Sequence, residues 1–409
     1  MSPTRRIRLL VLIGSMGGGG AERQVVNLLR DLDRTRFEPV LYLVYRTGPL
    51  LADLPEDVPG ISFDRLPART GWRRWLSRLP GQLRRDIIAD LTQTLIRERI
   101  DCVYDRTYHM TMLADPACQR AGVPRVSTVV SDPKSDFDLQ ERRFRAIKRH
   151  LLGRAYRRAD RVVAVSEGVR QGLLAEYAPP ADRVVTIYNP VDFERIERLA
   201  AEPLPESLRP PFDEPDARHL VAAGRLQVEK CFDRLITAFA EVAAARREPF
   251  HLHILGEGPL RPALTEQASR LGVGQRVHLW GFLPNPFPVF SRADLFVLSS
   301  HHEGFPGVLV EALAAGARGI VSTDCPHGPR EILDGGRCGW LVPPDETAAL
   351  AQGIAAALEQ PDETARRTTA ARLRVRDLCS RQATLARLEA LLETVVRERN
   401  PAWSTSSDG

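Results

Sequence analysis

Short apolar runs alternate with longer amphipathic stretches along the whole chain, and this alternation constrains the fold more than any other feature. Continuous apolar runs bounded by turn residues are typical of strands buried on both faces, and the stretches between them have helical spacing. The pattern predicts an α/β protein with parallel sheets covered by helices on both sides. The predicted strands cover residues 7–13, 39–44, 101–104, 125–130, 162–165 and 183–187, then 219–222, 251–255, 277–280, 295–298, 319–321 and 339–342.

The chain is long enough for two domains, because 409 residues exceed the roughly 250–300 at which single hydrophobic cores stop growing. Five prolines lie in the segment EPLPESLRPPFDEPD, residues 202–216, which is typical of a linker. We therefore expect a Rossmann-like domain over 1–200, a linker over 201–217 and a second Rossmann-like domain over 218–380. A helix over 381–398 is expected to pack back on the first domain, before a flexible tail over 399–409.

Charge is divided unevenly along the chain. Residues 1–190 hold 32 Lys and Arg against 22 Asp and Glu, a net charge of +10, whereas residues 191–409 hold 25 against 30, a net charge of −5. The basic first half predicts an anionic partner, such as a membrane surface, a phosphorylated substrate or a nucleic acid. The scattered cysteines and the lack of a spanning apolar segment predict free thiols and a protein that is cytosolic or peripheral to a membrane.

Two basic stretches bear on that partner. In residues 65–85, Trp72, Trp75, Leu76 and Leu79 have helical spacing with arginines between them, which is typical of an interfacial helix on anionic lipid. The residues predicted to contact the membrane are Trp72, Arg73, Arg74 and Trp75. The alternative is a surface helix that packs on its own domain. Residues 142–161 fit a packed helix with a basic outer face, and the apolar stripe expected to face the core is Phe144, Ile147, Leu151, Ala155 and Tyr156. Neither stretch carries a nucleic-acid-binding motif.

A glycine run, Gly17–Gly20, follows the first strand and precedes a helix. Glycines let backbone N–H groups approach an anion, and a helix N-terminus favours negative charge. A dinucleotide fingerprint would need a small residue where Glu22 stands, so binding of NAD is disfavoured. The alternative is a flexible turn between strand and helix.

A pair of cations opens the second half of the chain. Gly224-Arg225-Leu226 ends a strand, and Lys230 follows at the start of a helix, where a cation is unfavourable for helix stability. A bidentate arginine and a lysine suit a diphosphate. A solvated loop with two surface charges is the alternative.

The run EGFPGVLVEA is the most specific motif. It places Glu303 after a predicted strand and Glu311 about one turn into a helix, with backbone N–H groups near Val308 and Leu309 between them. Such a layout can bind a polyol, a phosphate and a ribose in turn. The neighbouring His301 and His302 do not complete a metal motif, and we expect no metal or other cofactor.

Together these residues resemble the retaining glycosyltransferases of family 4, also called glycosyltransferase group 1. The resemblance is carried by GSMGGGGAER, AVSEGVRQGL, YNPVD, AAGRLQVEK, HILGEGP and EGFPGVLVEALAAG, which extend over nearly the whole chain. It implies the GT-B architecture, with two facing Rossmann-like domains and an interdomain cleft. It also implies a metal-independent hexosyltransferase that moves a sugar from a nucleotide-sugar, expected to be a UDP-sugar, to a lipid-linked saccharide or polysaccharide acceptor. The expected location is the cytosolic face of the membrane.

The same resemblance assigns roles to single residues. Glu303 would contact the donor sugar and stabilise charge at its anomeric carbon, Gly304 and Phe305 would line the sugar pocket, and His109 would lie near the acceptor. The nucleotide part of the donor would be held by Gly18, Gly19, Arg225, Lys230, Gly256, Phe282, Val308, Leu309 and Glu311. The catalytic set is therefore Glu303, His109, Arg225 and Lys230. Two alternatives stay open, a sugar-nucleotide epimerase on the same fold and a non-catalytic subunit that binds sugar-nucleotides.

Overall fold

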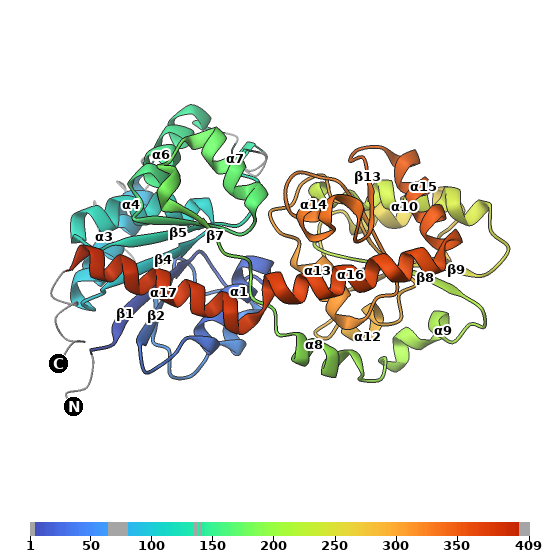
Figure 1. Ribbon diagram of the computed structural model, residues 1–409. Coiled ribbons are helices and arrows are strands. Elements are labelled where there is room, and N and C mark those ends of the chain that lie inside the picture. Colours follow the sequence, from blue (N-terminus) through green and yellow to red (C-terminus); the bar gives the residue numbers. More distant parts are fainter. Residues whose placement is uncertain (1–4, 64–80, 135–136, 139–140, 142, 401–409) are drawn as a thin grey trace. The chain divides into compact units, whose positions relative to one another are not determined.

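The computed structural model describes residues 5–63, 81–134, 137–138, 141 and 143–400. The chain divides into two compact units: unit 1 combines 1–189 with 382–409, and unit 2 holds 190–381. Each unit is a parallel sheet with helices on its faces (Figure 1), so the predicted α/β class is confirmed.

The sheet of unit 1 has seven strands in the order β3-β2-β1-β4-β5-β6-β7. All its pairings are parallel, as in β1 and β2, where Ile7 faces Phe37 and Ile13 faces Leu43. The strands are β1 (Ile7–Ile13), β2 (Phe37–Leu43), β3 (Gly60–Ser62), β4 (Cys102–Arg106), β5 (Arg125–Val129), β6 (Arg161–Ala164) and β7 (Val184–Thr186).

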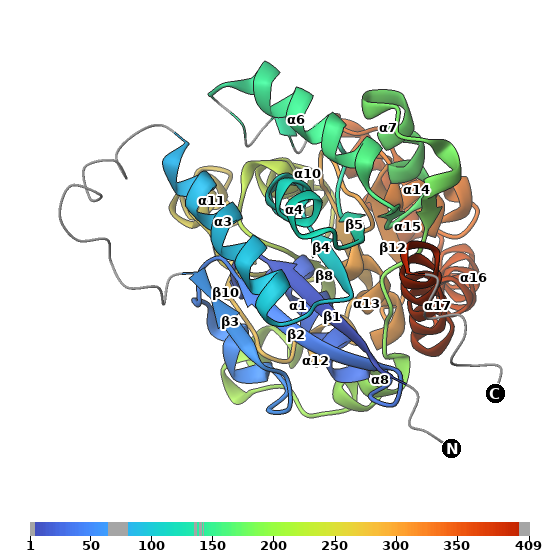
Figure 2. The same ribbon diagram turned by 90° about the vertical axis from the view of Figure 1, so that its left-hand side faces the viewer.

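Alternate residues of β1 point into two different cores. Leu9 and Val11 pack with α1 and α17, while Leu10 and Leu12 pack with α3 and α4 on the other face (Figure 2). The helical elements of unit 1 are α1 (Gly20–Asp31), η1 (Pro49–Asp53), α3 (Gln82–Arg97), α4 (Tyr108–Ala121), α6 (Arg145–Arg158), α7 (Glu167–Tyr177), η3 (Ala181–Arg183) and α17 (Arg381–Arg399).

Helix α17 belongs to unit 1 from Gln382 onward, although the rest of that unit ends at Asn189. It buries Leu388, Leu392 and Val395 against the β1 face, at the spacing of one helical stripe. Its Glu389 carboxylate also lies 2.9 Å from the Arg36 guanidinium. Apolar contact therefore fixes the end of the chain to unit 1.

The sheet of unit 2 has six strands in the order β10-β9-β8-β11-β12-β13, and all its pairings are parallel. The strands are β8 (Arg218–Ala223), β9 (Phe250–Leu255), β10 (Val277–Gly281), β11 (Leu295–Leu298), β12 (Ile320–Thr323) and β13 (Trp340–Val342). Leu220, Leu252 and Val297 face the core formed with α10, α11 and α15. The helical elements are α8 (Phe193–Ala200), η4 (Glu206–Leu208), α9 (Arg209–Phe212), η5 (Val228–Lys230), α10 (Phe232–Ala244), α11 (Arg261–Arg270), α12 (Phe287–Phe290), α13 (Gly307–Ala315), α14 (Gly328–Ile332), η6 (Asp334–Gly336), α15 (Thr347–Glu359) and α16 (Pro361–Cys379).

The proline-rich segment predicted as a linker lies inside unit 2. Its Leu204, Leu208 and Pro211 side chains are buried, and its prolines begin or flank the short elements η4 and α9. Prolines preset the backbone of such turns. The change of unit falls earlier, between Asn189 and Pro190.

Helix α6 differs from the prediction at its N-terminal end. Ala155 and Tyr156 are buried as expected, but Phe144 and Ile147 are 66% and 60% exposed. Phe144 precedes the helix in a left-handed conformation with φ 57°, and the buried residues of α6 lie in its second half. The expected core stripe is therefore wrong for Phe144 and Ile147. Trp72, Arg73, Arg74 and Trp75, predicted to contact lipid, lie outside the described residues.

None of the helices within the described ranges has both the length and the apolar character needed to cross a lipid bilayer.

Candidate functional site

The strand order of unit 2 reverses between β8 and β11. The first strand, β8, is followed outward on one side by β9 and β10 and on the other by β11, β12 and β13. Ligands of open parallel sheets bind at such a switch point, beyond the carboxyl ends of the strands. The loop after β8 carries Arg225 and Lys230, and the loop after β11 carries Glu303. Topology therefore brings together residues that are far apart in the sequence.

Lys230 and Glu303 form the centre of this site. The Lys230 Nζ lies 2.6 Å from Glu303 Oε1, and the side chains are 19% and 11% exposed. The Ser300 hydroxyl donates to the same Oε1 at 2.7 Å. One carboxylate oxygen thus accepts from a cation and from a neutral hydroxyl, and partial burial strengthens both interactions.

Hydrogen bonds to backbone carbonyls fix the loop after β8 relative to the loop after β11. The Ser299 hydroxyl donates to the Lys230 carbonyl at 2.7 Å, and the His301 N–H donates to the Glu229 carbonyl at 2.8 Å. From the next strand, the Thr323 hydroxyl donates to the Ser300 carbonyl at 2.6 Å. The position of Glu303 relative to Lys230 is therefore set by the backbone as well as by the ion pair.

Glycines let the loops after β8 and β9 touch backbone to backbone. A Cβ on Gly256, which has φ +138°, would lie 1.9 Å from the Gly224 carbonyl oxygen. A Cβ on Gly258 would lie 2.4 Å from the Leu226 carbonyl oxygen. Only a residue without a side chain fits at position 256, because the Gly224 backbone occupies the space of a Cβ.

The EGFPGVLVEA run forms a loop and the start of α13. Phe305 is buried, and the loop is packed so closely against α14 that a Cβ on Gly328 would lie 2.8 Å from the Phe305 Cα. Glu311 lies on α13 and is half-buried. The Leu309 N–H donates to the Pro306 carbonyl at 3.0 Å. That N–H group thus has a partner in the first turn of α13.

Two other predicted donor contacts are exposed at the ends of their strands. The Arg225 side chain is 66% exposed, and its guanidinium lies 3.8 Å from the Glu229 carboxylate. Phe282, which follows β10, is 53% exposed. Both side chains are accessible to a ligand at the carboxyl edge of the unit 2 sheet.

Unit 1 has its own switch point, between β1 and β4. The glycine run follows β1, and His109 lies on α4 after β4; a Cβ on Gly14 would lie 3.7 Å from the Met110 side chain. Gly18 has φ +89°, and a Cβ on Gly19 would lie 2.6 Å from the Glu22 carboxylate. The acidic group beside the N-terminus of α1 is thus the protein's own Glu22, which the dipole of α1 stabilises.

His109 contacts a carboxylate and an aromatic ring, and about half of its side chain is exposed. Its Nε2 lies 3.1 Å from Glu141 Oε1, its ring stacks on Tyr108 at 4.0 Å, and its side chain is 47% exposed. The nearly buried Glu141 also pairs with Lys148. This anchoring is compatible with a polar role at the carboxyl edge of the unit 1 sheet.

Burial and the Glu303 carboxylate together raise the pKa of the Cys325 thiol to about 12. Cys325 therefore stays protonated beside the site. Among the described residues, no group of three His, Cys, Asp or Glu side chains is arranged to hold a metal ion.

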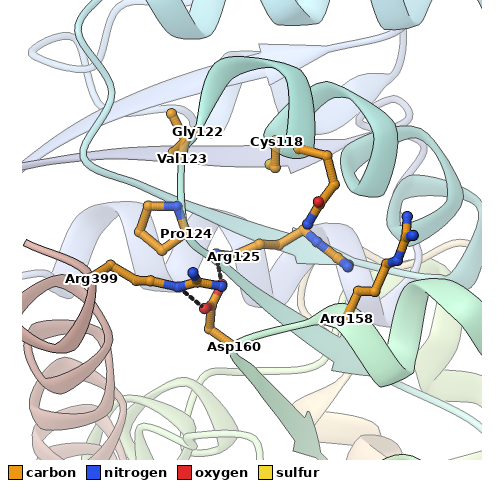
Figure 3. Close-up of a pocket in the computed structure, with 9 residues that line it drawn as sticks. Cys118, Gly122, Val123, Pro124, Arg125, Arg158, Asp160 and Arg399 are labelled. Atoms are coloured by element: carbon orange, nitrogen blue, oxygen red, sulfur yellow. Dashed lines mark hydrogen bonds and ion pairs between the residues drawn. The ribbon is translucent and has the colours of Figure 1, made fainter.

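A cavity of about 150 Å³ lies elsewhere in unit 1, at the amino ends of β5 and β6 (Figure 3). Asp160 accepts there from the Arg125 N–H at 2.8 Å and from the Arg399 guanidinium at 2.5 Å. The cavity is thus at the edge of the sheet opposite to the predicted site, and two of its charged side chains, Asp160 and Arg399, are paired with each other.

Sequence reasoning missed Ser300 and a set of stacked histidines in unit 2. Ser300 could have been noticed as a small polar residue at a strand end, three residues before Glu303. The histidines lie on one face of β8, β9 and β10, and the alternation of His251 with His253 is the period of a strand. The set comprises His219, His251, His253 and His278, with Trp280 at its end and Phe212 of α9 against it.

Two family models match the chain. Residues 18–195 match the model described as Glycosyltransferase Family 4, and residues 217–360 match the model described as Glycosyl transferases group 1.

Individual proteins are also similar to this chain, two in sequence and one in fold. The N-acetylgalactosamine-N,N'-diacetylbacillosaminyl-diphospho-undecaprenol 4-alpha-N-acetylgalactosaminyltransferase of Campylobacter jejuni is 27% identical over 366 residues, which cover 86% of this chain and 90% of that protein. The 2-deoxystreptamine glucosyltransferase of Streptomyces kanamyceticus is 30% identical over 293 residues, covering 68% and 71%. The crystal structure of Anabaena HepE with UDP and glucose matches with a TM-score of 0.77 at 21% identity, covering 95% of this chain and all of that one.

Proposed function

Because the chain belongs to the family 4, or group 1, glycosyltransferases, we propose that it is a retaining enzyme that transfers a sugar from a UDP-sugar to a lipid-linked saccharide or polysaccharide acceptor. The observation that carries this proposal is the Lys230–Glu303 pair at the switch point of unit 2. In this pair, the Lys230 ammonium can bind a diphosphate and the Glu303 carboxylate can bind sugar hydroxyls. The structural match to a UDP complex supports UDP as the nucleotide.

The proposed reaction breaks the bond between the anomeric carbon and the diphosphate oxygen. Negative charge then develops on the leaving diphosphate, and the cations Lys230 and Arg225 stabilise it. Glu303 binds the sugar and stabilises positive charge at the anomeric carbon. The acceptor hydroxyl attacks on the face from which UDP leaves, and its proton passes to the departing diphosphate. The new glycosidic bond therefore keeps the configuration of the donor.

The other predicted residues keep their proposed roles. Gly256, Phe282 and Glu311 bind the base and ribose, and Gly304 with Phe305 lines the sugar pocket. In unit 1 we propose that His109 lies near the acceptor. Backbone groups at Gly18, Gly19, Val308 and Leu309 are proposed to contact phosphate once the donor is bound. Because side-chain cations provide the positive charge, the proposed reaction is independent of metal.

The acceptor and location rest on two observations. The matched Campylobacter protein is named for a diphospho-undecaprenol substrate, which is a lipid-linked saccharide. The first 190 residues carry a net charge of +10 by the count above, which favours an anionic membrane surface. We therefore propose that the enzyme works as a peripheral protein on the cytosolic face of the membrane.

The test is release of the nucleoside diphosphate, UDP or GDP, from a panel of UDP-sugars and GDP-sugars, with and without a membrane extract that supplies acceptors. We expect release from one UDP-sugar that depends on the extract and is lost in Lys230→Ala. Release from a GDP-sugar alone would overturn the nucleotide assignment. A product of inverted anomeric configuration, determined by NMR, would overturn retention. Binding of nucleotide without turnover in any extract would favour a non-catalytic subunit.

A further inference from the structure

We propose that Ser300 is a positioning residue for recognition of the donor sugar: its hydroxyl keeps Glu303 in place when the donor diphosphate attracts Lys230. This inference rests on the proposed function. Ser300 has no role in the motif that predicted the site, which begins three residues later at Glu303.

The first argument is which oxygen of Glu303 is used. Both the Lys230 ammonium, at 2.6 Å, and the Ser300 hydroxyl, at 2.7 Å, donate to Oε1. A carboxylate oxygen has two lone pairs, so Oε1 accommodates both donors. Because both contacts fix the orientation of the carboxylate, they also fix the position of Oε2. Oε2 is the oxygen that would accept a hydrogen bond from a sugar hydroxyl.

The second argument is the difference between the two donors. An ammonium has three donors and a full charge, so a bound diphosphate competes with Glu303 for Lys230. A neutral hydroxyl is not drawn to the diphosphate in this way. When the donor binds, Ser300 is therefore the contact that continues to orient Glu303, while Lys230 is shared between carboxylate and phosphate.

The third argument is that Ser300 is itself rigid. The residue is 1% exposed, and its carbonyl accepts the Thr323 hydroxyl at 2.6 Å, which ties it to β12. The neighbouring Ser299 hydroxyl fixes the Lys230 carbonyl at 2.7 Å. The two successive serines thus have different partners. The Ser299 hydroxyl binds the Lys230 backbone, and the Ser300 hydroxyl binds the Glu303 carboxylate.

The experiment separates sugar from nucleotide. The wild type is first assayed with UDP-glucose and with UDP-N-acetylgalactosamine, and the donor that it turns over faster is chosen. For that donor, kcat and KM are measured for wild type and Ser300→Ala. The inhibition constant of UDP is measured for both proteins as well. We expect kcat/KM for the donor to fall about ten- to hundred-fold, as for loss of a hydrogen bond to a charged group. The inhibition constant of UDP should stay within about twofold of wild type, because UDP lacks the sugar that Glu303 binds.

The matched control is Ser322→Ala. Ser322 is also a fully buried serine near a strand end, but its hydroxyl donates to the Thr323 carbonyl at 2.9 Å. It should leave both constants near wild type. Equal weakening of donor turnover and UDP inhibition by Ser300→Ala would indicate general damage to the site and overturn the positioning role, as would a variant with unchanged kcat/KM. A wild-type protein that neither turns over donors nor binds UDP would instead refute the proposed function itself.

Discussion

The ammonium of Lys230 and the carboxylate of Glu303, separated by 73 positions in the chain, meet at 2.6 Å across the loops that follow β8 and β11. Each side chain is largely buried, so removal of one partner leaves the other charge poorly solvated. The two residues thus behave as one electrostatic unit at the carboxyl edge of the unit 2 sheet.

This coupling predicts non-additive effects. Lys230→Ala and Glu303→Ala should each lower kcat/KM by about 10²–10³, the range seen when one stabilising group is removed from a transition state. The double variant should lose much less than the product of the two factors, because the second change removes a charge that has already lost its partner. Steady-state kinetics of the four proteins measure this. Arg270→Ala, which breaks the exposed pair with Glu266 on α11, serves as the control with near-normal activity.

Gly256 should be intolerant of any side chain. The Cβ of an alanine at position 256 would lie 1.9 Å from the Gly224 carbonyl oxygen. The alanine backbone would also have to adopt a φ of +138°. We expect Gly256→Ala to lower the free energy of unfolding by about 3 kcal/mol or more, since both a clash and a strained backbone are introduced. Thermal and urea unfolding provide the measurement.

The comparison for this prediction is Gly272→Ala at the end of α11. Gly272 has φ +72°, but no atom lies within 4 Å of the added Cβ. It should cost about 1–2 kcal/mol, from the left-handed backbone alone. Equal costs for the two variants would contradict the close backbone contact of Gly256.

The stacked histidines predict a stability that falls in acid. Burial lowers the pKa of His219 and of His278 from 6.5 to about 4, and burial lowers the pKa of His253 well below its ordinary value. Between pH 6.5 and 4 the unfolded chain therefore binds more protons than the folded one, so the free energy of unfolding decreases as the pH falls through this window. Above about pH 7 the contribution is fully present.

A variant can isolate this effect from the titration of carboxylates. His278 Nε2 lies 3.1 Å from His251 Nδ1, and a glutamine amide can replace that contact without a titrating group. Urea unfolding of His278→Gln between pH 7.5 and 4.5 should show a shallower pH dependence than wild type, by up to one proton. Parallel curves for the two proteins would show that His278 is not held neutral in the fold.

Helix α17 should stabilise unit 1. Leu392 is fully buried against the β1 face, so Leu392→Ala should cost about 2–5 kcal/mol through lost burial and the cavity left behind. Leu373 on α16 is 64% exposed, and Leu373→Ala should stay within about 0.5 kcal/mol of wild type. Urea unfolding of both variants tests the contrast, and similar costs would contradict the packing of α17.

Chelation should leave activity unchanged. In the proposed reaction Lys230 and Arg225 carry the positive charge that stabilises the leaving diphosphate, so no divalent cation is needed. UDP release should proceed at the same rate in EDTA as in buffer with added Mg²⁺. Loss of activity in EDTA, restored by a divalent cation, would refute metal independence.

The sequence determined the alternating α/β elements, because strand and helix periods are local properties of the chain. It also singled out the Arg225–Lys230 pair as a candidate site, because cations near a helix start conflict with ordinary local preferences, and the EGFPGVLVEA run as another, from its two carboxylates across a helix start. Those signals reside in neighbouring residues and need no knowledge of the fold.

Other features required the tertiary structure. The ion pair of Lys230 with Glu303 depends on β8 lying next to β11, and strand order is a non-local property. The proline-rich segment is held by the buried Leu204 and Leu208, although its composition is that of a linker. Phe144 is the residue before α6, where it adopts a left-handed conformation outside the helix and is exposed. The ion pair and the burial of the proline-rich segment depend on contacts between residues distant in sequence. The exposure of Phe144 depends on where α6 begins. Apolar periodicity is a local pattern and predicts neither.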